Sequence, residues 1–165
     1  MRRAIVIPIL LAGVAACSRN PRPSGPVPQT ANEALTQFMA AVKANDLSRM
    51  GTLWGSDRGP AVTFWDRDRL RQHLATIQKY LDHTGWRVME GPLPAAPMNP
   101  TFKNVPSADK LRDFHIELQR NNCSHVLPIT VVRIDSGGWL VYDVHLEAAG
   151  NPMERCQPAG TGTRQ

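Results

Sequence analysis

The chain has 165 residues, a length typical of one domain. Hydrophobic residues make up 42% of it and charged residues 20%, which is enough apolar material for one core and excludes a wholly disordered chain. The formal charge is +5, and the three cysteines are too few for a disulfide-dense miniprotein. No apolar run reaches the ~20 residues of a membrane span, and no basic run with interleaved aromatic residues indicates a nucleic acid partner.

The first residues have the pattern of an export signal. A short basic start, Arg2 and Arg3, is followed by an apolar stretch over residues 4–14, too short to span a bilayer. The stretch ends in Val14-Ala15-Ala16, and small residues let the chain lie extended in a peptidase groove. Residues 1–16 are therefore predicted to be a signal peptide.

The run Val14-Ala15-Ala16-Cys17 resembles the lipobox of bacterial lipoproteins, in which small residues precede an invariant cysteine. The resemblance implies that the signal is cut before Cys17 and that this residue carries acyl chains such as palmitate. It implies a protein anchored to a membrane of the cell envelope and facing the periplasm. Ser18 after the cysteine implies the outer membrane. A plain signal peptide that happens to contain a cysteine is the alternative.

Residues 17–29 are predicted to tether the folded part to the membrane. They hold Pro21, Pro23, Pro26 and Pro28. Alternating prolines favour an extended, semi-rigid spacer of ~3.1 Å per residue. A flexible linker without special reach is the alternative.

The folded part begins with helical patterns. Thr30 and Glu33 fit a capping box, which predicts a helix over 31–44. Asn45-Asp46 can cap a second, shorter helix, and a third is predicted to start near Asp66 and to stop at Gly85. The apolar residues at helical spacing, expected to face the core, are Leu35, Phe38, Met39, Val42, Leu47, Met50, Leu53, Leu70, Leu74, Ile77 and Leu81.

After Gly85 the pattern changes to that of strands. Strands are predicted around Trp86 to Leu93, around 114–118, over 126–134 and over 139–146. Prolines make residues 92–106 an irregular connection or a broken edge strand. In the last strand the residues expected to share one face are Leu140, Tyr142, Val144 and Leu146.

Helices followed by antiparallel strands predict an α+β domain over residues 30–148. We expect two to three helices packed on one face of a curved, mostly antiparallel sheet of about four strands. Residues 149–165 form a polar tail, which we expect to fray from Pro152 onward.

This order of elements, with the final run Gly137-Gly138-Trp139-Leu140-Val141-Tyr142-Asp143-Val144, resembles the nuclear-transport-factor-2-like and cystatin-like α+β folds. The resemblance covers about residues 30–148 and implies a cone-shaped domain. The proline-rich segment 92–106 departs from the tight meander of that superfamily. Its members include enzymes, ligand binders and scaffolds, so the fold assigns no activity.

Cys123 and Cys156 remain once Cys17 is lipidated. In an oxidising compartment two such cysteines predict a disulfide, which would pin the tail to the turn at Asn121-Asn122. A pair of free thiols or a bridge between two chains is the alternative.

Histidines and carboxylates near the predicted strands are candidate ligands of a metal site. His115, Glu117, Asp143 and His145 could meet if their strands are neighbours, but a solvated sheet face or half of a dimer interface is the commoner arrangement. We expect no metal and no cofactor.

Aromatic residues could line a pocket inside a cone, although core packing explains them as well. The candidates are Trp54, Trp65, Tyr80, Trp86 and Tyr142. His73 and His83 lie on or near the third predicted helix, where Asp66 or Asp82 could pair with one of them. No set of residues matches a catalytic motif, so no catalytic residue is assigned.

The sequence thus favours a membrane-anchored, periplasm-facing lipoprotein whose domain binds a small molecule or a protein, or serves envelope assembly, without catalysis. A homodimer is compatible with it. The alternative is a small-molecule enzyme of isomerase, dehydratase or hydrolase type that uses a cone-shaped pocket.

Overall fold

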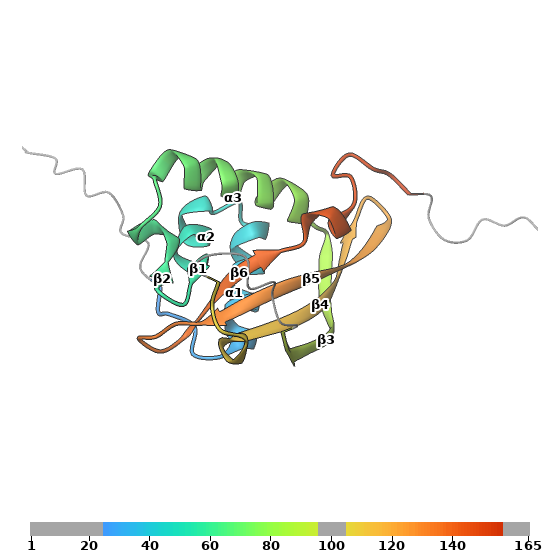
Figure 1. Ribbon diagram of the computed structural model, residues 1–165. Coiled ribbons are helices and arrows are strands. Elements are labelled where there is room, and N and C mark those ends of the chain that lie inside the picture. The colour runs from blue at the N-terminus through green and yellow to red at the C-terminus, as the bar shows by residue number, and fades with distance from the viewer. Residues whose placement is uncertain (1–24, 96–104, 157–165) are drawn as a thin grey trace, which may run out of the picture.

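Three α-helices and two antiparallel sheets form the part of the chain that this computed structural model describes, residues 25–95 and 105–156 (Figure 1). This architecture confirms the α+β class and the four main strands. The helices are α1 (Ala31–Lys43), α2 (Leu47–Leu53) and α3 (Arg67–Leu81). The larger sheet has the order β3 (Gly85–Pro94), β4 (Leu111–Arg120), β5 (Cys123–Arg133) and β6 (Trp139–Val144). The predicted signal peptide, Cys17 and most of the predicted tether lie outside the described residues.

Each helix begins where the sequence places a capping side chain. The side-chain oxygens of Thr30, Asp46 and Asp66 each accept a hydrogen bond from the backbone N–H three residues later, at 3.1, 2.8 and 2.9 Å. Such bonds satisfy amides that have no partner inside the helix. The carboxylate of Glu33 completes the first cap by accepting from the backbone nitrogen of Gln29, one residue before the expected position.

The end of α3 differs from the prediction. The helix ends at Leu81, and Gly85 is the first residue of β3 rather than the helix stop. Asp82 leaves the helical conformation, and its carboxylate accepts from the backbone nitrogen of His83. This local bond gives the backbone an alternative to one more helical turn.

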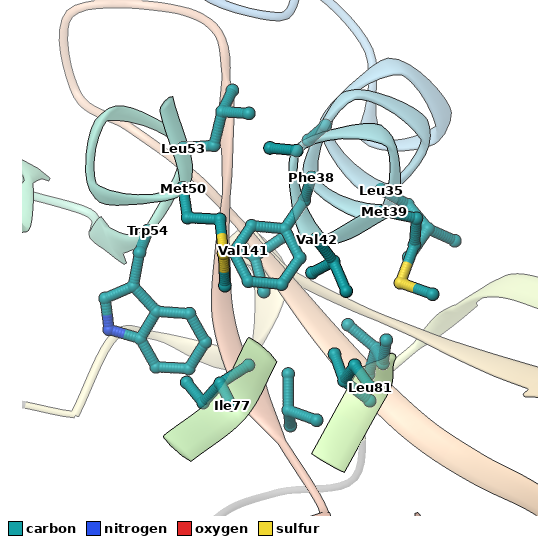
Figure 2. Packing of buried hydrophobic residues seen from close by; sticks show 14 of the residues in the cluster. Leu35, Phe38, Met39, Val42, Met50, Leu53, Trp54, Ile77, Leu81 and Val141 are labelled. Carbon is teal, nitrogen blue, oxygen red and sulfur yellow. The ribbon is translucent and has the colours of Figure 1, made fainter. Parts of the chain in front are cut away.

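The main core lies between the helices and one face of the larger sheet. All the apolar side chains predicted to face inward from α1 and α3 are buried, and Leu47 of α2 is partly buried against them. Figure 2 shows Phe38 between Met50 and Val42, and the rings of Phe38 and Trp54 have centroids 6.0 Å apart. From the sheet, Phe114, Ile116 and Leu118 are fully buried against this layer.

The other face of the larger sheet carries a second, smaller apolar cluster. Neighbouring residues of a strand point to opposite faces, so Val131 joins the main core and Val132 joins the second cluster. The buried members of this cluster are Ala95, Leu111, Val132, Ile134 and Leu140, and Tyr142 packs against them partly exposed.

The predicted face of the last strand is wrong in part. Leu140 and Tyr142 belong to the second cluster, whereas Val144 belongs to the main core. The register between β5 and β6 shifts between Thr130 and Val131, which leaves an additional residue on β6. Such a bulge moves the following side chains to the opposite face. The strand also ends at Val144, and Leu146 lies in a 3-10 helix, η3 (Leu146–Ala149).

The described structure has strands at the edge of the larger sheet and between α2 and α3. The proline-containing β3 is the edge strand of the sheet, with register shifts after Val88 and Glu90, so the broken edge strand is confirmed up to Pro94. Between α2 and α3, two further short strands, β1 (Gly55–Ser56) and β2 (Gly59–Pro60), form a two-residue antiparallel pair.

Both described ends of the chain are attached to the domain. At the N-terminal end, the Pro28 oxygen accepts from the Trp139 nitrogen at 2.8 Å, and the Pro26 oxygen accepts from Arg49 at 3.3 Å. At the C-terminal end, the Cys156 nitrogen donates to the Asn121 oxygen at 3.1 Å. The fraying expected from Pro152 is therefore wrong for residues 152–156, because this hydrogen bond and a disulfide hold them.

Candidate functional site

His73 of α3 lies between two indole rings. Its ring centroid is 5.2 Å from that of Trp54, in an edge arrangement, and 5.5 Å from that of Trp65. Trp54 follows α2 and is buried, whereas Trp65 precedes α3 and is 39% exposed. The imidazole thus connects the main core to the surface.

A short 3-10 helix, η1 (Ala61–Thr63), positions the exposed tryptophan. The backbone nitrogen of Trp65 donates to the Ala61 oxygen at 2.8 Å, and the Ala61 nitrogen donates to the Trp54 oxygen at the same distance. Gly51 of α2 allows η1 to come close, because a Cβ there would stand 3.0 Å from Val62 Cγ1. The path from Trp54 to Trp65 is therefore fixed by backbone contacts.

Three large hydrophobic side chains around η1 face solvent. Val62 is 46% exposed, and Phe64 and Trp65 are 39% exposed each. Arg58 places its guanidinium carbon 4.9 Å from the centroid of the Phe64 ring, a cation–π arrangement. We call these four residues the aromatic surface. Contiguous exposed apolar side chains bordered by charge are typical of binding sites.

His73 is a half-buried imidazole with an unsatisfied nitrogen. Its Nε2 is buried and has no hydrogen-bond partner among the described residues. Burial lowers the pKa of His73 below its usual 6.5, because the charged form loses hydration, and the nearby carboxylate of Asp143 opposes this effect. Burial therefore favours the neutral form of the ring.

Carboxylates and a histidine form exposed pairs where β6 ends. His145 Nδ1 lies 2.9 Å from Glu147 Oε1, and its Nε2 lies 3.7 Å from Asp143 Oδ2. The pKa of Glu147 is lowered by its hydrogen bonds, first to its own backbone and then to His145. Exposed pairs of this kind contribute little to stability.

The four residues considered as a metal site from the sequence do not form one cluster. His115 pairs with Glu90 at 3.4 Å, and Glu117 bonds to Arg87 and Ser124. His115 and Glu117 are on β4, and β5 separates them from Asp143 on β6. Two strand spacings amount to about 10 Å, too far for a shared ion.

The five aromatic pocket candidates lie at three places. Trp54 and Trp65 meet at His73, while Tyr80 and Trp86 pack against the main core elsewhere. Tyr80 is seven residues after His73 on α3, about 10 Å along the helix. Tyr142 packs against the second cluster on the other face of the sheet. His83 is buried, and its Nδ1 lies 2.8 Å from the Leu81 backbone oxygen.

The structure joins Cys123 and Cys156 in a disulfide, as the sequence predicts, with Cα atoms 5.0 Å apart and a sequence separation of 33. Two residues that sequence reasoning missed, His125 and Glu154, lie beside it. The signal for them is spacing: His125 is two residues after one cysteine, and Glu154 is two residues before the other.

Comparison of the chain with protein-family models, with curated proteins and with solved structures gave no match. None of the helices within residues 25–95 and 105–156 combines the length and the apolar character that crossing a membrane requires.

Proposed function

We propose that the chain is a lipid-anchored protein of the bacterial envelope whose domain binds a partner through the aromatic surface and catalyses no reaction. The observation that carries this proposal is the contrast between interior and exterior. Apolar side chains occupy the space between helices and sheet (Figure 2). Val62, Phe64 and Trp65, which are close in sequence, are each exposed, and Arg58 lies over the Phe64 ring. Aromatic residues and arginine are enriched at the centre of protein interfaces.

The anchor is proposed at Cys17, on the residues Val14-Ala15-Ala16 that precede it and the apolar stretch before them. Two or more acyl chains hold a protein stably at a membrane, since each buried methylene contributes about 0.8 kcal/mol. The periplasm-facing outer membrane is the proposed location. The order of three helices and a four-stranded antiparallel sheet supports a nuclear-transport-factor-2-like cone as the finer description of the fold.

Labelling with a radioactive or alkyne-tagged fatty acid in a bacterial host tests the anchor. The full chain is expected to take up label and to fractionate with membranes. Cys17→Ser is expected to take up none and to keep its signal peptide, whereas the matched control Ser18→Ala is labelled normally. A wild-type chain that is never labelled contradicts the anchor.

Photo-crosslinking tests the aromatic surface as a binding site. A photoreactive amino acid replaces Trp65 in the full chain, and in the control it replaces Val126, which is 53% exposed on β5. We expect a discrete crosslinked product from position 65 and none from position 126, and Phe64→Ser should weaken it. A product of twice the chain mass identifies a homodimer. Equal crosslinking at both positions, or none at either, contradicts the proposal.

A second candidate function, a small-molecule enzyme, rests on His73. A neutral imidazole between two indole rings, with the carboxylate of Asp143 near it, is the kind of group that acts as a general base. If this function holds, natively purified protein carries a small molecule that His73→Gln loses and His115→Gln keeps, as mass spectrometry would show. Failure to retain any ligand favours the non-catalytic function.

A further inference from the structure

At the turn between β4 and β5, four side chains that can ligate a metal ion come together. The Cys123 sulfur, a ring nitrogen of His125 and a carboxylate oxygen of Glu154 all lie within 4.8 Å of one another. Cys156 is the fourth, since its sulfur is bonded to that of Cys123. Thiolate, imidazole and carboxylate are the ligands that Zn²⁺ takes in tetrahedral protein sites.

The imidazole of His125 is held in place, yet one of its nitrogens lacks a hydrogen bond. Nε2 is buried, has no partner within hydrogen-bond distance among the described residues, and lies 3.7 Å from Glu154 Oε2. Gly150 packs directly on the ring, because a Cβ at that position would stand 2.4 Å from Cε1. A positioned imidazole nitrogen without a partner is available to a metal ion.

In addition to the disulfide, hydrogen bonds hold the C-terminal segment against this turn. The backbone nitrogen of Cys156 donates to the backbone oxygen of Asn121, and the side-chain nitrogen of Asn121 donates to the backbone oxygen of Glu154, both at 3.1 Å. Arg120 donates to the Ala149 oxygen at 2.8 Å. We expect these contacts to keep residues 149–156 near His125 when the sulfur–sulfur bond is broken.

We propose that reduction of the disulfide converts this cluster into a Zn²⁺ site with Cys123, His125, Glu154 and Cys156 as ligands. A dithiol supplies the two electrons: its two S–H groups become one disulfide, and the Cys123–Cys156 bond becomes two thiols. Both thiols release their protons to solvent as Zn²⁺ binds. Two thiolates and one carboxylate then face the ion, so the site has a net charge of −1.

The oxidised chain has no comparable affinity, because the two sulfurs are bonded to each other and are not thiolates. The bridge and the ion are therefore mutually exclusive states of one site. This inference does not depend on the anchor at Cys17 or on the aromatic surface.

A Zn²⁺ titration of the full chain tests the proposal. One sample is reduced with a water-soluble phosphine and freed of it without oxygen, and the other stays oxidised. A chromophoric chelator competes for the ion in both. We expect one Zn²⁺ per reduced chain and an affinity about 100-fold or more above that of the oxidised chain. Co²⁺ in place of Zn²⁺ should give a thiolate-to-cobalt charge-transfer band and the strong visible absorption of tetrahedral coordination.

Variants distinguish the four-ligand site from two thiolates alone. His125→Ala and Glu154→Gln should each weaken Zn²⁺ binding to the reduced chain by about 10-fold or more. The matched control His115→Ala, a partly exposed histidine elsewhere on the same sheet, should bind Zn²⁺ as the wild type does. Reduced and oxidised chains that bind equally, or two ligand variants that bind like wild type, overturn the proposal.

Circular dichroism of the same samples measures their thermal unfolding. The reduced chain should melt at a higher temperature with Zn²⁺ than without it, since a ligand that binds only the folded state stabilises it. His125→Ala should lose most of that increase. A reduced chain whose melting temperature does not respond to Zn²⁺ also overturns the proposal.

Discussion

Arg120 is buried, with 6% of its surface exposed, and donates a hydrogen bond from Nη1 to the backbone oxygen of Tyr80, 2.6 Å away. Tyr80 lies in the last turn of α3, where carbonyl oxygens have no partner inside the helix and the helix dipole is negative. The other terminal nitrogen donates to the Ala149 oxygen at 2.8 Å. One buried cation thus joins α3, β4 and the C-terminal segment through carbonyl oxygens.

Replacing this arginine should destabilise the protein strongly. Arg120→Met keeps much of the apolar volume but leaves the Tyr80 and Ala149 oxygens without these donors. We expect the free energy of unfolding to fall by about 2–4 kcal/mol, the cost of losing charge-assisted hydrogen bonds to buried groups. Urea denaturation of the oxidised wild type and variant measures this difference in unfolding free energy.

Arg133→Met is the matched control for that variant. Arg133 is exposed on β5, so its replacement should change the unfolding free energy by less than about 0.5 kcal/mol. Equal effects of the two substitutions would show that the buried hydrogen bonds of Arg120 do not stabilise the fold.

The bridge between Cys123 and Cys156 should stabilise the oxidised protein. It closes a loop of 33 residues, which corresponds to about 3–4 kcal/mol in the chain-entropy model. Denaturation of wild type with and without reductant, in the presence of a chelator, measures this difference. Counting thiols in denatured, unreduced protein is the control: two reactive thiols in addition to position 17 would exclude the bridge.

His73 should make the protein less stable in mild acid. Its pKa is lowered in the folded state by burial, so the unfolded chain binds a proton more readily than the folded chain. The stability that the neutral His73 contributes is fully present above the unfolded pKa of 6.5 and is lost as the pH falls toward the folded pKa. We expect the free energy of unfolding to decrease between pH 7.5 and pH values below about 6.5.

His73→Gln should remove that part of the pH dependence, because glutamine does not titrate. His115→Gln, which changes a partly exposed histidine, should keep it. Denaturant unfolding at several pH values compares the three proteins. Identical pH profiles for wild type and His73→Gln would mean that another group causes the loss in acid.

A side chain at Gly150 should destabilise the protein. Its backbone angles, φ 70° and ψ −178°, belong to a region that is almost confined to glycine, and a Cβ there would collide with the His125 ring. Gly150→Ala should cost about 1–3 kcal/mol of unfolding free energy. Gly137→Ala is the control, because Gly137 has a positive φ of 92° but no neighbour within 4 Å of the added Cβ. It should cost less than Gly150→Ala in the same denaturation assay, and the reverse order would rule out the collision.

The helices could be predicted from the sequence because their signals are local. Thr30, Asp46 and Asp66 each cap a helix through a backbone amide three residues away, and the apolar spacing follows from the helical repeat. The bulge opposite Thr130 could not be predicted in this way. It depends on how β5 and β6 pair, and no residue of β6 alone indicates it.

Among the candidate sites, too, some could be predicted from local sequence and others depend on tertiary packing. The cysteine pair could be predicted because two cysteines have one partner each, but His125 and Glu154 have no periodic pattern that connects them across 29 positions of sequence. The contact of Trp54, His73 and Trp65 likewise requires the path of η1 between α2 and α3. Tertiary packing brings these residues together, so the two-residue spacing of His125 and Glu154 from the cysteines indicates a site only once the disulfide is known.

The Pro28 carbonyl, bound to Trp139 beside the β5–β6 hairpin, fixes where the N-terminal segment joins the domain. Cys123 begins β5 and the hairpin follows Arg133, so these places are separated by the length of that strand, about 33 Å. If Cys17 holds the protein at a bilayer, the sulfur atoms lie at the end of β5 remote from the place where the N-terminal segment joins the domain. Soluble thiol carriers and metal ions would then reach them without approaching the headgroups.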